Sequence, residues 1–520
     1  MKKLLLIFFI LFSYTTSVYA QEPAMLWLKG YGGDQGAQVL THVTATQDGG
    51  FIIALETSSD VGTGNIDSLC TAERKRVIFV KYNADASVME WTKCYGFGGD
   101  STLLYLFPTN DGGFVLGGEG GFLICKEDAL GTIIWSRNYG ISADVGLIDM
   151  IATDDGGYLM VGNCYFNDTN FTVYNSGSFL PSIAVLKLDS LGNKQWSKAI
   201  GGSYVTEALS VIPGPNGGCY IFGGTTCNDY DCTGLHGPPN TAADAYLVRL
   251  DSKGNIIWHH DLGGSGIDGD YGWGVANNKG GVVLAASSYS LDGDVHHHIG
   301  QSDYWVLEVD SSNNILWDNS YGSISQEVPF AICKADDGSI WITGGSGQKG
   351  GEVDTAYGQG DAWIVHVDSL GNFLSAKVLG SSEIDEGYMI YPLSGGGVIT
   401  GGTYSKGDDC FSSFPFYGIP SLESDAFLGG VAPYTTGVKQ ISINSGIKVY
   451  PNPTHEQVIV ETQKQDTYTI VLTDVLGQKV YQARFTGKIN IAVNEWLRGI
   501  YYVQVVSEDG QMATRKLLIK

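Results

Sequence analysis

Asp251-Ser-Lys-Gly-Asn-Ile-Ile-Trp258 is one copy of the phrase that decides the fold of this chain. The other copies occupy residues 189–196, 310–317 and 368–375, the last without the Trp, and degraded copies end at Trp91 and Trp135. Successive positions of the phrase's Trp, counted from Trp27, are 44 to 64 residues apart. A phrase that recurs at such intervals indicates an array of similar structural units.

A second phrase marks a hairpin turn in every unit. Asp, Asn or another residue, followed by a Gly pair or Gly-Ser and then by apolar residues, begins at Asp48, Asp111, Asp155, Asn216, Lys279, Asp337 and Gly395. Asp-Gly before alternating apolar residues is typical of a β-hairpin, since Gly adopts positive backbone angles without steric cost. Each unit then contains four strands, with this turn after the first and the Asp-Ser-x-Gly turn after the third.

Seven such units without long helical patterns predict an all-β fold, namely a seven-bladed β-propeller over residues 21–434. Solenoid stacking is the weaker alternative. The last unit, near residues 425–431, lacks a Trp strand of its own, whereas residues 25–33 form such a strand without a unit. We therefore expect the N-terminal strand to close the propeller, which removes exposed sheet edges. The repeated Trp residues are expected to pack between blades.

The N-terminus carries a targeting signal. Lys2 and Lys3 precede an apolar run at residues 4–12, and small residues end at Ala20, so residues 1–20 are predicted to be a cleavable signal peptide. Later segments fall short of the roughly 20 apolar residues that a membrane helix needs. The mature chain is therefore expected to be secreted, without a transmembrane segment.

The net charge restricts the possible binding partners, and the number of cysteines restricts the possible disulfide pairing. The formal net charge is −25, which argues against nucleic acid or anionic lipid, because both require Lys and Arg to neutralise phosphates. An odd number of cysteines, nine, leaves at least one unpaired. Cys227 and Cys232 are close enough in sequence to close a small loop, and the others are expected to be buried thiols.

After Tyr434, a linker at residues 435–446 leads to a differently built segment, residues 447–520. Short strands of alternating apolar residues predict a small Ig-like β-sandwich. Four short elements occur in it, in this order: Tyr450-Pro451-Asn452-Pro453, Leu476-Gly477, Leu497-x-Gly499-x-Tyr501, and the basic and apolar end from Lys516 to Lys520.

These four elements, in this order, resemble the type A C-terminal sorting domain of type IX secretion substrates. The resemblance implies that an outer-membrane translocon and its processing machinery read the domain and then remove it. It also implies that the cargo is released or attached to surface lipopolysaccharide. An ordinary Ig-like adhesion module is the alternative. Acidic, Gly-rich propellers with Asp-Gly-Gly repeats resemble the cargo found ahead of such domains, but this resemblance assigns no chemistry to a residue.

Long loops between the second and third strands are predicted to share one face of the propeller. Their aromatic residues form the candidate binding face: Tyr165, Phe166, Tyr230, Tyr289, Phe414 and Tyr417. Asp292 and Asp294 form an Asp-x-Asp pattern of the kind that holds Ca²⁺, and loop carboxylates that cap turns are the alternative. His296-His-His298 is expected to be a polar loop, because adjacent residues point in different directions.

The sequence contains no nucleophile elbow, zinc-protease helix or phosphate-binding Gly loop in a suitable context. Our first hypothesis is a secreted, non-catalytic binding or adhesion protein with a glycan or protein ligand. A secreted glycoside hydrolase or lyase with carboxylates at the propeller mouth is the second, and a purely structural surface protein is the third. Carboxylates clustered at the mouth favour an enzyme, whereas exposed aromatics favour binding.

Overall fold

The fold is all-β: the described residues form 35 strands and two short 3-10 turns, and none of them forms an α-helix. The computed structural model describes residues 23–32, 37–46, 48–57, 76–84, 86–96, 103–109, 111–118, 122–128, 130–139, 145–167, 170–173, 180–393, 396–405, 408–412, 424–432, 447–462, 467–473, 479–494, 496, 498–507 and 512–520. Outside these ranges lie the predicted signal peptide, the predicted linker, and Phe414, Tyr417, Leu476 and Gly477. The chain divides into two compact units, one formed by Glu22–Tyr434 and one that contains Thr435–Lys520.

Seven antiparallel four-stranded sheets make up the unit of residues 22–434. Six of them follow chain order: β2 to β5 (Gln38–Ala45, Phe51–Thr57, Arg76–Tyr82, Met89–Gly96), β6 to β9 (Leu103–Pro108, Phe114–Gly118, Leu123–Glu127, Ile133–Asn138), β10 to β13 (Val145–Ala152, Tyr158–Cys164, Ser182–Leu188, Lys194–Ile200), β14 to β17 (Thr206–Pro213, Cys219–Thr225, Asp244–Leu250, Ile256–Leu262), β18 to β21 (Asp268–Ala276, Val282–Ser288, Asp303–Val309, Ile315–Tyr321) and β22 to β25 (Glu327–Lys334, Ile340–Ser346, Asp361–Val367, Phe373–Leu379). The 3-10 turns are η2 (Pro215–Gly217) and η3 (Asp409–Phe411).

The seventh sheet combines both ends of this unit. Its strands are β26 (Glu386–Pro392), β27 (Val398–Tyr404), β28 (Asp425–Val431) and the N-terminal strand β1 (Met25–Tyr31). β1 pairs antiparallel with β28, so that Trp27 lies opposite Gly430. A Cβ at Gly430 would lie 2.6 Å from Trp27 Nε1, so this glycine leaves the room that the indole ring occupies.

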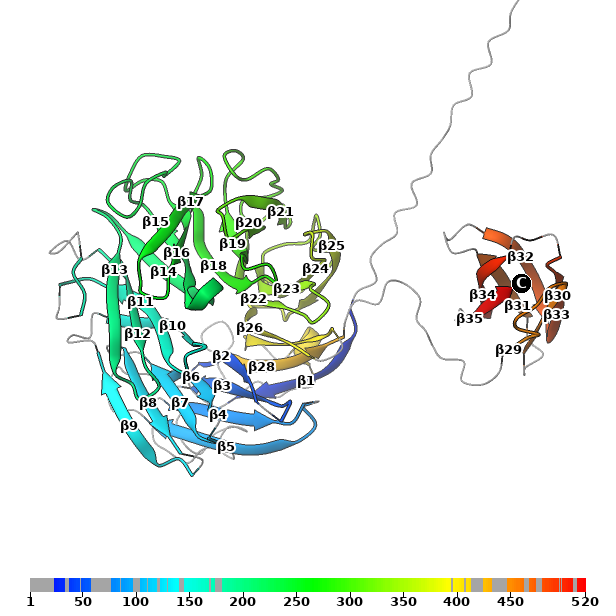
Figure 1. Ribbon diagram of the computed structural model, residues 1–520, viewed down its shortest axis with the longest axis horizontal. Coiled ribbons are helices and arrows are strands. Elements are labelled where there is room, and N and C mark those ends of the chain that lie inside the picture. The colour runs from blue at the N-terminus through cyan, green and yellow to red at the C-terminus, as the bar shows by residue number, and fades with distance from the viewer. Residues whose placement is uncertain are drawn as a thin grey trace, which may run out of the picture. The chain divides into compact units, whose positions relative to one another are not determined.

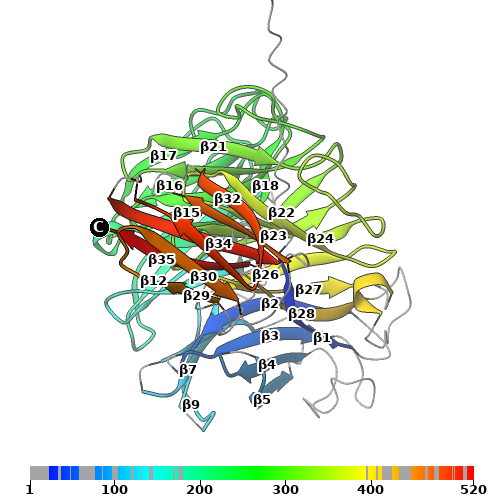
Figure 2. The same ribbon diagram turned by 90° about the vertical axis from the view of Figure 1, so that its right-hand side faces the viewer.

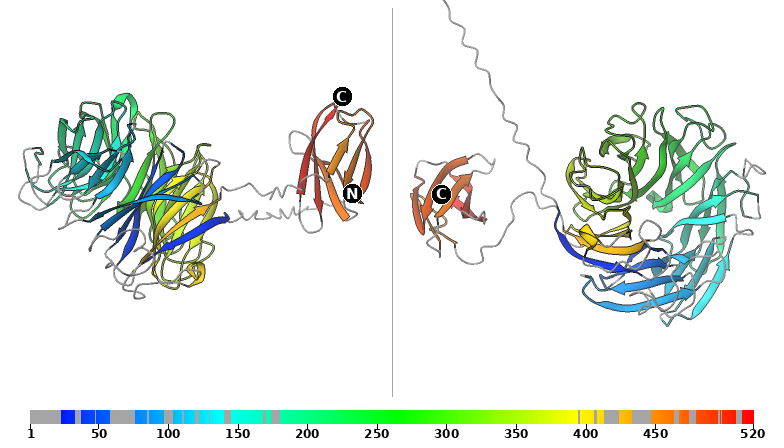
Figure 3. Two further views of the ribbon diagram at one scale, coloured as in Figure 1. Left: turned by 90° about the horizontal axis from the view of Figure 1, so that it is seen from below. Right: turned by 180° about the vertical axis from the view of Figure 1, so that it is seen from behind.

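The seven sheets follow one another around a common centre, with β2, β6, β10, β14, β18, β22 and β26 innermost (Figure 1). Each of these strands contacts the next, and β26 contacts β2. An apolar core lies between each pair of neighbouring sheets. The core between the seventh and the first sheet joins Met389 and Leu428 to Leu40 and Ile53. Figure 2 and Figure 3 show the same sheets from other sides.

The repeated sequence phrase links neighbouring sheets. In the turn between β16 and β17, Asp251 Oδ1 accepts hydrogen bonds from the backbone N–H groups of Lys253 (2.8 Å) and Asn255 (2.9 Å). Trp196 of the preceding sheet packs over this turn and donates from Nε1 to the Ser252 carbonyl (3.1 Å). Trp258 in turn donates to the Ser311 carbonyl (3.2 Å) of the following sheet. The predicted packing of the Trp residues between sheets is confirmed at these positions.

Residues 447–520 form two sheets that share one apolar core. One sheet contains β29 (Ile447–Tyr450), β30 (Gln457–Thr462) and β33 (Lys488–Ala492), and the other contains β32 (Lys479–Thr486), β31 (Thr467–Thr473), β34 (Gly499–Ser507) and β35 (Met512–Ile519). Val458 and Val460 of the first sheet share this core with Ile470, Val503 and Leu517 of the second. Alternating burial along the strands, as in β30, produces this arrangement.

Cys94 is disulfide-bonded. The other described cysteines are thiols, and all of these except the half-buried Cys410 are buried. In the part of the chain that the structure describes, no helix has the length and apolar character that crossing a membrane requires.

Candidate functional site

The variable loops of residues 22–434 come together at one end of the sheets. Strand pairing places Thr206, which begins a first strand, opposite Thr225, which ends a second strand. Thr225 in turn lies opposite Asp244, which begins a third strand. The loops between second and third strands and the links between sheets therefore lie at this end, which we call the loop end. The tight turns after the first and third strands occupy the opposite end, the turn end.

Four of the six aromatic residues predicted to form a binding face are described, and all four belong to loop-end segments. Tyr230 is 63% exposed and Tyr289 is 38% exposed, whereas Tyr165 and Phe166, directly after β11, are half-buried. Tyr289 Oη accepts a hydrogen bond from Gln326 Nε2 (3.3 Å) in the link to the following sheet. Of these four residues, the two exposed ones therefore lie on the loops of the β14–β17 and β18–β21 sheets.

Further apolar side chains are exposed at the loop end, and sequence reasoning missed them. Leu291 is 77% exposed in the loop that also carries Tyr289. The other members are Ile267, Ile299, Ile324, Tyr357 and Ile384. Ile267 and Ile384 each directly precede the Asp of a link between sheets, and this repeated Ile-Asp pair was the signal that could have drawn attention to them. Apolar side chains gathered on one surface mark sites of interaction.

Asp292 and Asp294, the predicted calcium ligands, accept hydrogen bonds from the neighbouring link. Asp292 Oδ1 accepts from Ser265 N (2.6 Å), and hydrogen bonds from Ser265 lower the pKa of Asp292. Asp294 Oδ2 accepts from Gly263 N (3.2 Å). Among the described residues, no three His, Cys, Asp or Glu side chains are grouped to hold a metal ion. This geometry favours turn-capping carboxylates, the alternative role, and calcium binding stays a prediction.

The same acidic contact occurs in three other sheets. Asp229 accepts from Ser203 N (2.8 Å) and Ser203 Oγ (2.6 Å). Asp408 accepts from Ser382 N (2.9 Å) and Ser382 Oγ (2.8 Å), and Glu352 accepts from Gly322 N (3.2 Å). We call this contact between a loop carboxylate and the adjacent link the acidic clasp. The acidic side chains that form this contact therefore have a structural role in the long loops.

A row of buried carboxylates also lies at the loop end. Asp244, Asp303 and Asp361 begin third strands, and Asp385 lies in the link before β26. Burial raises the pKa of Asp244 to about 6 and that of Asp385 to about 7. The negative charge of Asp361 raises the pKa of Asp385 further. Carboxylates removed from water in this way favour their protonated forms.

His236 connects this row to the next sheet. Its Nδ1 lies 2.8 Å from Asp244 Oδ2, and its Nε2 lies 4.0 Å from Asp294 Oδ2. Burial opposes the charged imidazolium, but the hydrogen bond to Asp244 and the charges of both carboxylates raise the pKa of His236. The contacts of His236 therefore join the β14–β17 sheet to the loop that carries Asp294.

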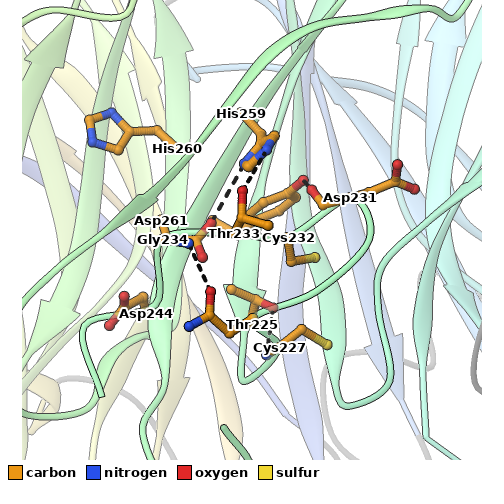
Figure 4. A network of polar contacts seen from close by, with 12 residues as sticks. Thr225, Cys227, Asp231, Cys232, Thr233, Gly234, Asp244, His259, His260 and Asp261 are labelled. Carbon is orange, nitrogen blue, oxygen red and sulfur yellow. Dashed lines mark hydrogen bonds and ion pairs between the residues drawn. The ribbon is translucent and has the colours of Figure 1, made fainter. Parts of the chain in front are cut away.

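The polar network around the end of β17 is shown in Figure 4. His259 Nδ1 lies 3.8 Å from the buried carboxylate of Asp261, and Thr233 Oγ1 lies 3.4 Å from His259 Nε2. Tyr246 Oη donates to the Asp231 carbonyl (2.6 Å). These contacts fix the loop of residues 226–243 to the strands below it, so its surface residues are presented on a supported backbone.

Aromatic rings also line three neighbouring innermost strands. Tyr271 of β18 and Phe330 of β22 have ring centroids 5.7 Å apart, and Phe330 and Tyr388 of β26 have centroids 4.9 Å apart. Burial and the charge of Asp270 raise the pKa of Glu207, which lies on β14. Sequence reasoning missed this group, because the separation between these residues hides their proximity in the fold.

Two of the described sorting motifs, the Pro-Asn-Pro turn and the Gly499 strand, contact the last strand of the C-terminal unit, β35. Asn452 Oδ1 accepts a hydrogen bond from Leu518 N (2.9 Å). Next to it, Thr454 N donates to the Leu518 carbonyl (2.9 Å) and Lys520 N donates to the Thr454 carbonyl (3.0 Å). The Pro-Asn-Pro turn at the start of this unit therefore holds the end of the chain.

The other described motif residues surround the same strand. Gly499 pairs with Ile519, Tyr501 pairs with Leu517, and Lys516 in β35 lies opposite Tyr502. Pro451 and Pro453 follow cis peptide bonds. Tyr450 Oη donates to Glu461 Oε2 (2.6 Å), and this bond raises the pKa of Tyr450.

Residues 448–520 match the family described as Secretion system C-terminal sorting domain. The matched range begins within β29 and includes β30 to β35. It supports the type IX secretion resemblance and implies export to the cell surface or the medium. Within this sorting domain, the contact between Asn452 and β35 is the feature that sequence reasoning missed, since the two segments lie at opposite ends of the domain.

Comparisons with whole proteins give weaker likenesses. No curated protein matches the chain. Similar solved structures include the WD40 domain of Neurospora crassa Pan2 (10% identity, TM-score 0.41, 79% of this chain and 98% of that chain) and a puromycin-hydrolyzing peptidase of Mycobacterium tuberculosis (10%, 0.39, 81% and 57%). Another is the calcium-binding protein regucalcin of Agrobacterium tumefaciens (12%, 0.31, 60% and 86%). We draw no argument about fold or function from these low TM-scores.

Proposed function

We propose that this chain is a type IX secretion substrate whose cargo domain is a seven-bladed β-propeller with a binding face at its loop end. In this proposal residues 1–20 are a signal peptide, 21–434 the propeller, 435–446 a linker and 447–520 an Ig-like sandwich that acts as sorting domain. The outer-membrane translocon and its processing machinery read and remove the sorting domain. The propeller is then released or attached to the outer surface.

Two features support the closed propeller. Trp27 of β1 lies opposite Gly430 of β28, so the two ends of this unit are in one sheet. Met389 and Leu428 share an apolar core with Leu40, in the same way that the other neighbouring sheets share cores. Sheets that bury both faces against neighbours are the basis of propeller stability.

The convergence of the matched motifs on β35 is the single observation that carries the export proposal. A translocon that reads a folded domain needs a defined surface, and the Asn452 contact gives the chain end a fixed position. A reporter protein with a signal peptide and residues 435–520 should reach the medium or cell surface. The same reporter without residues 435–520 should stay in the periplasm, and equal export of both would contradict the proposal.

The proposed binding role rests on the apolar side chains at the loop end. Tyr230 and Leu291 are more than half exposed on loops that acidic clasps hold in place. Exposed aromatic groups on a supported backbone give stacking area for a sugar ring or an apolar peptide side chain. We infer a non-catalytic adhesion or binding role, with a glycan or protein as ligand.

A glycan array probed with the purified propeller tests the glycan form of this role. Tyr230→Ala and Leu291→Ala should each weaken binding about tenfold, which corresponds to about 1.4 kcal/mol. Leu191→Ala is the matched control, because Leu191 is 65% exposed at the turn end. Equal losses in all three variants, or no effect of the loop-end changes, would contradict a binding face at the loop end.

One observation keeps a secreted glycoside hydrolase or lyase as the second candidate. Glu207 and Asp270 lie on adjacent innermost strands, and burial and neighbouring charge raise the pKa of both carboxyl groups. A carboxylic acid with a raised pKa beside a second carboxylate is the arrangement that glycoside hydrolysis uses. Polysaccharide hydrolysis that is lost in Glu207→Gln would support this candidate over the binding role.

A further inference from the structure

Cys227 and Cys232 lie near each other within the loop that joins β15 to β16. Thr206 Oγ1 lies 3.3 Å from Cys227 Sγ and 3.4 Å from Cys232 Sγ. The two thiols also hydrogen-bond to each other. Both side chains are buried and both are thiols in this structure. Figure 4 shows them in the same loop, close to Thr225.

The backbone between these cysteines is fixed by its own contacts. Asp229 takes part in the acidic clasp with Ser203, and Cys232 N donates to the Asp229 carbonyl (3.0 Å). Tyr230, between them, has a φ of 52°, in the left-handed region that a large side chain rarely adopts. Both sulfur atoms lie within reach of one hydroxyl group, so the folded loop already holds the two thiols near each other.

We propose that Cys227 and Cys232 form a disulfide bond in the exported protein, and that this bond locks the loop that presents Tyr230 at the loop end. Disulfides form and persist in exported proteins, because the compartments they reach are oxidising. The proposal rests on export and not on the binding role. It assigns a covalent modification to a loop whose cysteines are otherwise buried thiols.

The oxidant is a protein disulfide of a thiol oxidase. The Cys227 thiolate attacks this disulfide, so a mixed disulfide forms and the first thiolate of the oxidase leaves. The Cys232 thiolate then attacks Cys227 Sγ, which forms the intramolecular bond and releases the second oxidase thiolate. Two electrons and two protons pass to the oxidase, which becomes a dithiol. Because both sulfur atoms are buried in the folded chain, this exchange occurs before the loop is fully packed.

The packed loop also favours the thiolate form of Cys227 over its thiol form. Hydrogen bonds from the Cys232 thiol, the Thr206 hydroxyl and the backbone N–H of Tyr204 lower the pKa of Cys227 to about 6, against the opposing effect of burial. The Tyr204 N to Cys227 Sγ distance is 3.1 Å. The thiolate is the reactive form in disulfide exchange.

Mass spectrometry of the full chain from the medium or periplasm tests the proposal directly. Trypsin releases Ala199–Arg249 as one peptide that contains Cys219, Cys227 and Cys232 and no internal Lys or Arg. After alkylation in denaturant without reductant, this peptide should carry one alkyl group and be about 2 Da lighter than its unbonded form, because two hydrogens are lost. After reduction it should carry three. Three alkyl groups before reduction would overturn the proposal.

The variant Cys219→Ser shows which two of the three cysteines in this peptide form the disulfide bond. Cys219 lies on β15, and its buried thiol is the third cysteine of the same peptide. In this variant the peptide should take up no alkyl group before reduction and two after it. Two alkyl groups before reduction would show that Cys219 belongs to the bond, which also overturns the proposal. The readout is a mass, so a failure of the glycan-binding test leaves it unaffected.

Discussion

Gly254 shows why single positions of the repeat require a particular residue. Its φ is +81°, and an added Cβ would lie 2.8 Å from Trp196 Cε3 of the neighbouring sheet. Gly49 has a similar φ of +83° and open space around it. A glycine is therefore required at both positions by backbone conformation, but only at Gly254 by contact with the next sheet.

This difference predicts unequal costs for alanine. Gly49→Ala should lower the free energy of unfolding of residues 22–434 by about 1–2 kcal/mol, from the left-handed backbone alone. Gly254→Ala should cost about 1–3 kcal/mol more, because the Trp196 ring must also move. Urea unfolding of the two variants measures the difference, and equal losses would show that the Trp contact is not tight.

Asp385 gives a prediction about pH. Burial raises its pKa in the folded protein to about 7, above the unfolded value near 3.9. The folded state therefore holds the proton more tightly, so the stability contributed by Asp385 is present at low pH and is lost as the pH rises from about 4 to about 7. In Asp385→Asn this loss is absent.

Urea unfolding at several pH values isolates this effect. Relative to Asp385→Asn, the wild type should lose up to about 1 kcal/mol per pH unit between pH 4 and 7. Asp128→Asn is the control, since hydrogen bonds from its turn lower the pKa of Asp128. If the wild type instead gained stability over Asp385→Asn in this range, the raised pKa would be wrong.

Among structural elements, the acidic clasps include the two loop residues for which the sequence left calcium binding and turn capping open. Asp292 and Asp294 already accept hydrogen bonds from the link of residues 263–265. We therefore predict that calcium and a chelator give the same melting temperature, and that Asp292→Ala lowers it in both. A calcium-dependent rise in the wild type that Asp292→Asn/Asp294→Asn removes would restore the calcium site.

Two substitutions of Asn452 test the role of its contact in the sorting domain. Asn452→Ala removes the acceptor for Leu518 N, so β35 should loosen and less protein should reach the medium. Asn452→Asp keeps an oxygen acceptor for Leu518 N at that place and should restore export. Immunoblots of cell and medium fractions measure both variants. Normal export of the alanine variant would show that this contact does not matter to recognition.

Sequence predicted those elements that depend on local chemistry. The Asp-Ser-x-Gly-Asn turn is set by hydrogen bonds within five residues, such as those from Asn255 to Asp251. Contacts between segments that lie far apart in the sequence could not be predicted from such local patterns. Tyr271, Phe330 and Tyr388 meet only because neighbouring innermost strands place them together, and no local pattern marks Asp292 as an acceptor for Ser265.

At the scale of the whole molecule, we propose different roles for the two units. In the seven sheets of residues 22–434, the repeated Trp, Gly and Asp residues have structural roles in turns and between sheets, which leaves the loop end as the surface that varies. The second unit contains the matched sorting family and concentrates its motifs on the chain end. In our proposal, export depends on the second unit and ligand binding on the first.

Fractionation and intact mass of the full chain, compared with a chain that ends at Tyr434, test this division most directly. We predict that the full chain reaches the cell surface or medium without residues 1–20 and without roughly its last eighty residues. The truncated chain should remain in the periplasm with its propeller folded. If both chains leave the cell equally, residues 435–520 are not the export signal, and the central claim is wrong.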